Sequence, residues 1–384
     1  MRRGVADLPL HGGHVPPWLA SRMKKLSKLI VELVIDEYDT KGLLERLADP
    51  VWFQAFSNII GMDWDSSGST TVTTGILKEV LSRNDFGVYM AGGKGGKSLK
   101  TPEELRKYAE RINIDSKRLI EVSMLVAKID NTALQDGYQL YHHAFFVDEK
   151  GVWAVVQQGM NKKKSMARRY HWFSETLEVK VSSPHSGISG VREELVLNTV
   201  DRGIDEYRKT VVDLAQENPT SLESELKTVQ MLLKGYKPLT YYTPYDTSML
   251  RRKAYRYLRI GPLTVNKKAL IAAKECGPRS YVDLLKIRGI GPSTIRALSL
   301  IAELVYETSP SWRDPVSHPP DPFKFAYAVG GKDGIPFPVD RKTYDEVIDM
   351  LQYLIDRTRD KYLFRKLASL TKNWSPPPEE KIPT

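Results

Sequence analysis

The spacing of apolar positions predicts a chain built mainly of helices, with a smaller amount of strand. Apolar residues recur at helical spacing over residues 17–35, directly after a proline that can open a helix. Two apolar runs, 143–147 and 152–157, are separated by the turn-forming sequence Asp-Glu-Lys-Gly and predict a β-hairpin. From residue 191 onward the pattern is almost wholly helical. The expected fold class is therefore α+β and mostly helical.

Shorter signals lie between these elements. Residues 43–47 and 50–60 predict short helices, whereas the polar stretch DWDSSGSTTVTT at 63–74 predicts a loop or a helix cap. Residues 86–90 predict a short strand. The sequence TPEE at 101–104 predicts a helix start, because it combines a hydroxyl cap, an early proline and acidic residues in the first turn.

The pattern divides the chain into three units. We expect an N-terminal α+β domain over residues 1–190, which carries the hairpin, and an all-helical domain over 191–310. A C-terminal helical extension and tail should cover residues 311–384. A proline-rich stretch at 309–322 marks the linker before it.

The stretch AGGKGGKS at 91–98 fits the loose form of a phosphate-binding loop. A working loop of that kind leads directly into a helix, but here the predicted helix begins three or four residues beyond Lys97 and Ser98. The strand predicted before it is also short. We therefore expect no ATP site here, but a lysine-bearing loop that could guide nucleic acid or simply lie on the surface.

The net charge of +10 is concentrated in one window. Residues 251–300 contain twelve Lys and Arg residues and two acidic residues, so this window alone carries +10 and the rest of the chain sums to zero. Such concentration is typical of a surface that binds a polyanion, because neutralised phosphates release counterions. The plain alternative is a set of solvated helix faces.

The end of this window resembles a helix–hairpin–helix motif, a sequence-independent DNA-binding element of many repair and replication proteins. Residues 280–304, SYVDLLKIRGIGPSTIRALSLIAEL, predict a short helix capped by Ser280, a Gly-Ile-Gly turn, and an amphipathic helix opened by Pro292. The resemblance implies that backbone amides beside the glycines approach DNA phosphates. The residues expected to contact DNA here are Lys286, Arg288, Gly289, Ile290, Gly291, Ser293, Thr294 and Arg296.

Polar residues of the first half form a second group of candidates. Six of the seven histidines lie before residue 190, and carboxylates and imidazoles can hold a divalent ion that activates water at a phosphate. The candidate catalytic residues are Asp63, Lys128, Asp130, Asp136, His143 and His171, and the candidate ligands of a Mg²⁺ or Mn²⁺ ion are Asp63, Asp65, His142 and His143.

Basic and aromatic residues alternate in the same half. Arg168 and Arg169 lie next to Tyr170 and Trp172, and such a group could hold a substrate strand by charge and stacking. For each of these residues, and for each histidine, the alternative is a structural role in the core.

The remaining composition excludes several classes of protein. The hydrophobic fraction of 41% and the charged fraction of 27% are those of an ordinary globular protein. A single cysteine, Cys276, excludes an intrachain disulfide framework and a zinc site built on several thiolates. The N-terminus has no apolar segment of signal-peptide length, and the most apolar early stretch is too short to span a bilayer. We expect a cytoplasmic protein without a membrane partner.

The order of several segments is similar to that of an uncharacterised prokaryotic family, domain-of-unknown-function family 763. The segments are RRGVADLPLHGG, VWFQAF, GMDWDSSGSTT, LQDGY, VVQQGMN, ARRYHWF and PFPVDRKTYD. The resemblance covers nearly the full length and implies an archaeal or bacterial protein. It brings no established activity, so no catalytic residue is taken from it.

The leading hypothesis from the sequence is a DNA-binding protein that acts as a metal-dependent nuclease in repair or recombination. A non-catalytic nucleic-acid-binding or scaffold protein is the main alternative, and RNA is an alternative ligand because backbone clamps carry little sequence information. A DNA glycosylase is a further alternative, because Pro338-Val339-Asp340 is similar to the Pro-Val-Asp of helix–hairpin–helix glycosylases.

Overall fold

The computed structural model describes residues 15–62, 67–233, 247–318 and 339–357. The helices in these ranges are α1 (Pro17–Leu47), α2 (Pro50–Ile59), α3 (Ser67–Arg83), the 3₁₀ helix η1 (Gly95–Lys100), α4 (Thr101–Ile112), α5 (Ser116–Lys128), the π-helical turn η2 (Ile129–Ala133), α6 (Asp205–Ala215), α7 (Pro219–Leu233), α8 (Thr247–Ile260), α9 (Lys267–Cys276), α10 (Tyr281–Lys286), α11 (Pro292–Val305) and α12 (Arg341–Arg357). The strands are β1 (Val88–Lys94), β2 (Leu134–Gln135), β3 (Gln139–Asp148), β4 (Trp153–Asn161), β5 (Met166–Ser174), β6 (Gly187–Ser189) and β7 (Leu197–Asn198). The chain is α+β and mostly helical, which confirms the expected class.

An antiparallel sheet with the strand order β1-β3-β4-β5-β6 forms the centre of the first half. The predicted hairpin is confirmed as β3 and β4, with His143 opposite Gln157 and Val147 opposite Trp153. Strand β5 extends the sheet beyond β4 and was not predicted as a strand. A separate two-stranded ladder joins β2 to β7.

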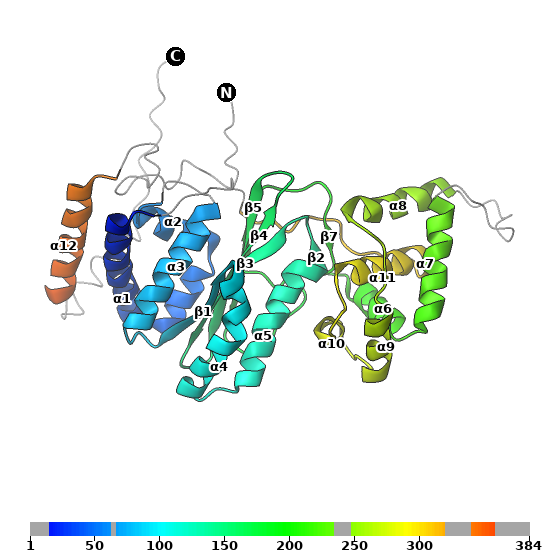
Figure 1. The fold of residues 1–384 in the computed structure, drawn as a ribbon, viewed down its shortest axis with the longest axis horizontal. Coiled ribbons are helices and arrows are strands. Elements are labelled where there is room, and N and C mark those ends of the chain that lie inside the picture. The colour runs from blue at the N-terminus through cyan, green and yellow to red at the C-terminus, as the bar shows by residue number, and fades with distance from the viewer. Residues whose placement is uncertain (1–14, 63–66, 234–246, 319–338, 358–384) are drawn as a thin grey trace, which may run out of the picture.

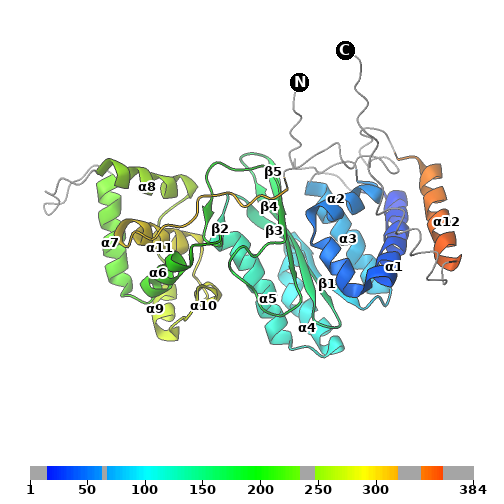
Figure 2. The ribbon, with the colours of Figure 1, turned by 180° about the vertical axis from the view of Figure 1, so that it is seen from behind.

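The sheet is covered on both faces (Figures 1 and 2). Alternate residues of β3 and β4 enter two different apolar cores, because successive side chains of a strand point to opposite faces. Ala144 and Phe146 join the core formed with α1, α2, α3 and α12. Phe145 and Val155 join the core formed with α4, α5, α6 and the α9–α11 region.

The helical half lies beside α5 and the β2–β7 ladder (Figure 1). Helices α7, α8 and α11 form a third apolar core around Leu226, Tyr257 and Leu300. After this half the chain returns to the sheet, where Ser311 bridges Asn198 and His318 bridges Ser189.

Helix α12, at the far end of the molecule from α10 and α11 in Figure 1, packs against α1. Arg22 pairs with Asp345 at 2.6 Å, and the Tyr344 hydroxyl donates to the Ile60 carbonyl at 2.8 Å. The C-terminal extension is therefore attached to the first half of the chain.

Two local predictions differ from the structure. The stretch 63–74 was expected to be a loop or cap, but α3 begins at Ser67 and runs through its threonines. Thr74 donates to the Thr70 carbonyl one turn earlier, at 2.7 Å, and Thr73 donates to Ser57 at 2.9 Å. These contacts satisfy hydroxyl groups that would otherwise disfavour a helix interior.

The glycine-rich stretch also differs from expectation, because its first four residues are part of strand β1. Gly92 has φ of +91°, and a Cβ there would lie 2.2 Å from the His143 carbonyl oxygen. The Gly92 amide donates to Glu104, and Lys78 binds both the Gly92 carbonyl and Glu104 at 2.7 Å. Glycine at this position thus allows both the strand pairing and the contact with α4. This helix begins at Thr101 as predicted, but the predicted hydroxyl cap is wrong, because Thr101 donates to the Ser98 carbonyl instead.

Among the described helices, none has a stretch apolar and long enough to cross a bilayer.

Candidate functional site

The pleat of the sheet separates the candidate residues of the first half into two groups. On one side of β5, Arg168 and Tyr170 contact Asp136, and Trp172 contacts Asp130 of η2. On the other side, Arg169 contacts α2 and α3, and His171 contacts the last carbonyl of α1. On β3, His142 contacts Thr74 of α3 at 3.0 Å, and His143 contacts Ser123 of α5 at 2.8 Å. Neighbours in sequence therefore lie on opposite sides of a strand and cannot act on one ion or one substrate atom together.

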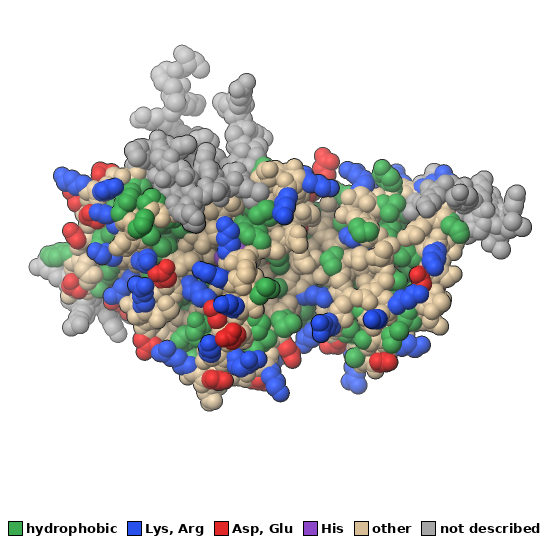
Figure 3. Space-filling model, in the orientation of Figure 1, with side chains coloured by type: hydrophobic (Ala, Val, Ile, Leu, Met, Phe, Trp, Pro, Cys, Tyr) green, Lys and Arg blue, Asp and Glu red, His purple; other side chains and the backbone are tan. Residues whose placement is uncertain are grey.

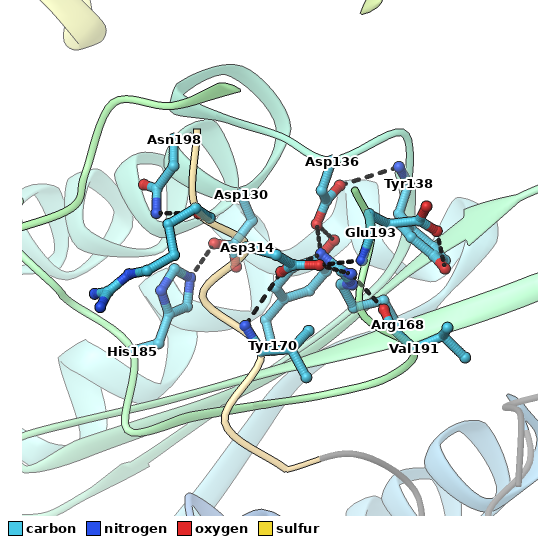
Figure 4. Close-up of polar contacts among 12 residues, drawn as sticks. Asp130, Asp136, Tyr138, Arg168, Tyr170, His185, Val191, Glu193, Asn198 and Asp314 are labelled. Carbon is cyan, nitrogen blue, oxygen red and sulfur yellow. Dashed lines mark hydrogen bonds and ion pairs between the residues drawn. The ribbon is translucent and has the colours of Figure 1, made fainter. Parts of the chain in front are cut away.

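Asp130 is the centre of the first group, and Figure 4 shows its contact with His185. It lies in η2, directly after α5, and is fully buried. Its Oδ2 accepts hydrogen bonds from Gln157 at 2.6 Å and from the Trp172 indole at 2.9 Å. Its Oδ1 pairs with His185 Nε2 at 2.5 Å. Three donors from three segments thus fix the orientation of this carboxylate.

Arg168 organises another cluster on the same side of the sheet as Asp130 (Figure 4). Its guanidinium contacts Asp136 at 2.8 Å, Asp314 at 2.7 Å and the Val191 carbonyl at 2.6 Å. Tyr170 donates to Asp136 at 2.8 Å. All four charged and phenolic groups lie in the interior. Arg168 thereby ties β5 to the returning segment around Asp314.

The charges of this cluster stabilise one another. Burial raises the pKa of Asp136, and Arg168 and the Tyr170 hydroxyl oppose that rise. Burial alone would lower the pKa of Arg168, but Asp136 and Asp314 outweigh it and raise that pKa. The guanidinium therefore stays charged, and we assign Arg168 and Asp136 to a structural ion-pair cluster. The prediction that Arg168 holds a substrate strand is corrected, because its side chain is inaccessible.

A cavity of about 820 Å³ opens beside these clusters, between segments 183–188, 192–202 and 311–317. His185 is part of its lining, and 7% of that side chain is exposed. Three arginines, Arg192, Arg202 and Arg313, also line it. Such a volume is typical of a small-ligand site.

The second group, on the α3 side of the sheet, is a closed hydrogen-bond network. Arg169 Nε donates to His171 Nε2 at 2.9 Å, so that nitrogen must carry the lone pair and Nδ1 must donate to the Leu47 carbonyl at 3.0 Å. Burial, and then the nearby Arg169 charge, keep the pKa of His171 well below its usual value. His171 is neutral, and both ring nitrogens are occupied. The predictions of a catalytic His171 and of a strand-binding Arg169 are corrected.

The hairpin histidines are also buried and neutral. Burial lowers the pKa of His142 to about 3 and also lowers the pKa of His143. His143 uses both ring nitrogens, with Ser123 at 2.8 Å and Gln157 at 2.7 Å. His143 therefore has no free ring nitrogen with which to act as a base or bind a metal ion in this structure.

The predicted ion site is not assembled by the part of the chain that the structure describes. His142 and His143 point to opposite faces, and Asp63 and Asp65 lie outside the described residues. No group of three or more His, Cys, Asp or Glu side chains suited to a metal ion occurs within the described ranges. Lys128 lies half-buried at the end of α5, and burial lowers its pKa.

The helical half presents a second candidate site, the turn between α10 and α11. Ser280 caps α10 in a reciprocal box with Asp283, which confirms the predicted cap. Gly289 has φ of +92°, and its carbonyl accepts from Asn266 at 3.3 Å. Ile290 is fully buried beneath the turn. Gly291 is the N-cap of α11 and Pro292 its first residue, so no side chain caps the amides of the first turn.

Most basic residues of the 251–300 window lie on the surface of the helical half. All are exposed except Lys253, which is half-buried, and Arg296, which is buried. Among the described residues, ion pairs with carboxylates are formed only by Lys253, Lys267 and Lys286 of this set. Lys and Arg side chains spread across the face of the molecule in Figure 3. The window is thus a cationic surface with little internal neutralisation.

Two of the predicted DNA contacts have other partners. Arg296 donates to the Pro262 carbonyl at 2.9 Å and to Gln135 at 2.5 Å, and burial lowers its pKa. The Thr294 hydroxyl accepts from the Asn266 amide at 3.1 Å. These side chains hold the turn in place and are not available to a phosphate. Lys286 and Arg288 are exposed, and Ser293 is half-buried.

Asp340, which motivated the glycosylase alternative, caps α12. It accepts from the Lys342 amide at 3.0 Å and the Thr343 hydroxyl at 2.7 Å. Because α12 lies beyond α1 at one end of the molecule, with the central sheet between it and the α10–α11 turn (Figure 1), Asp340 is remote from that turn.

Sequence reasoning missed His185 and Asp314 as members of the buried clusters. His185 was one of six histidines without a distinguishing spacing, and Asp314 lies in a proline-rich stretch that predicts a linker. The only local signal is that Asp314 precedes a proline in a segment otherwise poor in acids.

Comparison with known proteins gives one match. No curated protein and no solved structure matches the chain. A family model described as "Protein of unknown function (DUF763)" matches residues 4–339, which include the sheet, the cavity and the α10–α11 turn. The chain therefore belongs to the DUF763 family.

Proposed function

We propose that this protein binds the sugar–phosphate backbone of nucleic acid, primarily DNA, through a helix–hairpin–helix motif formed by α10, the turn and α11. The observation that carries the proposal is the uncapped first turn of α11, which follows the exposed Arg288 in a half of the chain whose exposed Lys and Arg residues mostly lack carboxylate partners among the described residues. Amides at a helix start attract phosphate through their hydrogen atoms and the helix dipole, and such contacts read no base.

The positions of the glycines support this assignment. Gly289 supplies a left-handed residue that bends the chain, and Ile290 anchors the turn in the core. At Gly291, the nearest atom to an added Cβ would be the Gly289 carbonyl oxygen at 4.0 Å. The space outside Gly291 is therefore open, as close approach of a phosphate requires.

Helix α8 extends the cationic surface with an aromatic side chain. Tyr255 is 62% exposed, and at helical spacing it lies next to Arg251, Arg252 and Arg259, which are also exposed. Arginines around an exposed ring are suited to an unpaired base, which stacks on the ring while its phosphates meet the charges. This favours DNA that includes a single-stranded part.

The binding test uses Gly291→Ala in the full chain, with fluorescence anisotropy of labelled DNA over a range of salt concentrations. The added methyl group meets open space, so the fold should be unchanged while the phosphate approach is blocked. We expect weaker binding for Gly291→Ala. A matched control is Gly75→Ala in α3, where an added Cβ meets nothing within 4 Å.

The salt dependence gives a second criterion. Wild-type affinity should fall steeply with salt, because phosphate contacts release counterions. Binding that is insensitive to salt, or equal for wild type and Gly291→Ala, would refute the motif as the binding site. Labelled RNA in the same assay distinguishes the two nucleic acids.

A second candidate function is cleavage of the bound strand, as a nuclease in repair or recombination that uses Mg²⁺ or Mn²⁺. The specific observation in favour is the Asp130–His185 pair at the cavity. Incubation of single-stranded, duplex and branched DNA with Mg²⁺ or Mn²⁺ tests it. Absence of cleavage with every substrate would leave a non-catalytic nucleic-acid-binding protein.

A further inference from the structure

We propose that the cavity bounded by segments 183–188, 192–202 and 311–317 is a phosphodiester site in which His185 is the general base and Asp130 positions it. This rests on the proposed nucleic-acid function, and it names the residue and the place at which cleavage would occur. Among the described histidines, only His185 combines a carboxylate partner with a place in the lining of this cavity.

The hydrogen bonds of Asp130 determine which nitrogen of His185 is basic. Gln157 and the Trp172 indole are donors and occupy Oδ2, so Oδ1 accepts the proton of His185 Nε2. In the neutral ring the lone pair then lies on Nδ1. Nδ1 forms no hydrogen bond with a described residue and is not among the buried polar atoms that lack a partner, so it is exposed to solvent on the side of the cavity.

The ring is also held sterically. The ring centroids of Trp172 and His185 lie 4.5 Å apart, and only 7% of the His185 side chain is exposed. A carboxylate that fixes the tautomer and packing that fixes the ring plane are the two supports that a general-base histidine needs.

The charge of the cavity suits an anionic ester. Arg192, Arg202 and Arg313 line it, and the only acidic residues in the lining are Asp201 and Asp314. Asp201 pairs with Arg313 at 2.8 Å, and the Asp314 carboxylate is neutralised by buried Arg168. The exposed Arg202 guanidinium has no ion-pair partner among the described residues and is available to a phosphate oxygen.

The cavity is structurally connected to the DNA-binding turn. Asn198 lines the cavity and belongs to β7, which pairs with β2. On β2, Gln135 donates to the carbonyl of Pro292, the first residue of α11. Only the β2–β7 pair therefore lies between the cavity and the uncapped start of α11. A nucleic-acid strand that binds at the α10–α11 turn can extend into the cavity.

The proposed reaction is hydrolysis with water as the only co-reactant. His185 Nδ1 takes a proton from water while the water oxygen forms a bond to phosphorus. The bond from phosphorus to the leaving ester oxygen breaks, and that oxygen takes a proton from solvent. The products are a phosphate monoester and an alcohol, and His185 returns its proton to solvent.

The test measures hydrolysis of bis-para-nitrophenyl phosphate and of a fluorescein-labelled oligonucleotide by the full chain, with Mg²⁺, with Mn²⁺ and with neither. His185→Gln, which can still donate to Asp130, should lower kcat by a factor of about 10²–10⁴ without a matching change of KM. Arg202→Ala should instead raise KM. Added imidazole should restore part of the activity of His185→Ala, an effect that a purely structural histidine would not show.

The control is His318→Gln, because His318 is a half-buried histidine whose side chain hydrogen-bonds only to Ser317 among the described residues and does not line this cavity. It should hydrolyse both substrates like the wild type. Wild-type rates in His185→Gln, or no hydrolysis by the wild type under any of the three conditions, would overturn the proposal.

The two proposals fail separately. Salt-dependent DNA binding that Gly291→Ala weakens, together with hydrolysis that does not depend on His185, would retain the binding function and refute this site. His185-dependent hydrolysis of bis-para-nitrophenyl phosphate without DNA binding would retain this site and refute the binding function. The two results can be separated because that small ester does not need the helical half.

Discussion

Replacement of Arg168 by methionine should be among the most destabilising single changes in the described part of the chain. The guanidinium is fully buried and contacts Asp136 at 2.8 Å and Asp314 at 2.7 Å, with its centre 4.7 Å from the Tyr138 ring. Methionine has a similar length and no charge, so the change leaves two carboxylates in the interior without their cation.

The size of the effect follows from that geometry. Breaking a buried ion pair by removal of one partner costs about 3–5 kcal/mol, because the remaining charge stays desolvated. Arg168 serves two carboxylates and one carbonyl, so we expect the upper part of this range. Asp136→Asn in the Arg168→Met background should recover part of the loss, since it removes one of the two charges and keeps an acceptor for Tyr170.

The assay is urea unfolding followed by circular dichroism, with the free energy of unfolding compared between variants. Arg313→Met is the matched control, because that pair has the same 2.8 Å separation from its aspartate but 71% of the Arg313 side chain is exposed. Its loss should stay within about 1 kcal/mol. A loss for Arg168→Met no larger than that of the control would refute the assignment of Arg168 to the structural core.

Three further outcomes follow from the same structure. Gly289→Ala should lower the free energy of unfolding by about 1–3 kcal/mol, because φ is +92° there, whereas Gly291→Ala should not; urea unfolding of both checks this. Tyr255→Ala should weaken binding of single-stranded DNA by about 1–3 kcal/mol in an anisotropy titration, and Tyr255→Phe and the remote Tyr353→Ala should not. His142, whose pKa is lowered to about 3 in the folded chain, should reduce the free energy of unfolding in acid. Below about pH 6.5 the unfolded chain binds a proton on this histidine and the folded chain does not. The contribution of His142 is therefore complete above about pH 6.5, and the free energy of unfolding falls by about 1.4 kcal/mol per pH unit toward pH 3. In urea unfolding at pH 7 and pH 5, His142→Gln should lose less stability between the two values than the wild type, and an equal loss would contradict the assignment.

Local signals in the sequence determined many element boundaries of this protein. The Ser280 cap, the proline that opens α11, the helix start at Thr101 and the β3–β4 hairpin are all where the sequence predicts them. Each depends on interactions between residues a few positions apart, such as a hydroxyl and the amide three residues later. Such interactions can be recognised without knowledge of the rest of the chain.

Only the tertiary structure decided which polar residues meet. Asp130 was a candidate, but its partner His185 lies 55 residues away, and Arg168 meets Asp314 across 146 residues. His142 and His143 are adjacent in sequence, but the strand pleat sends them into different cores. Arginine is usually a surface cation, but Arg169 and Arg296 are buried and hydrogen-bonded to other parts of the chain, so they have a structural role. Charge and residue type are local properties, whereas accessibility depends on what the rest of the chain packs against each side chain.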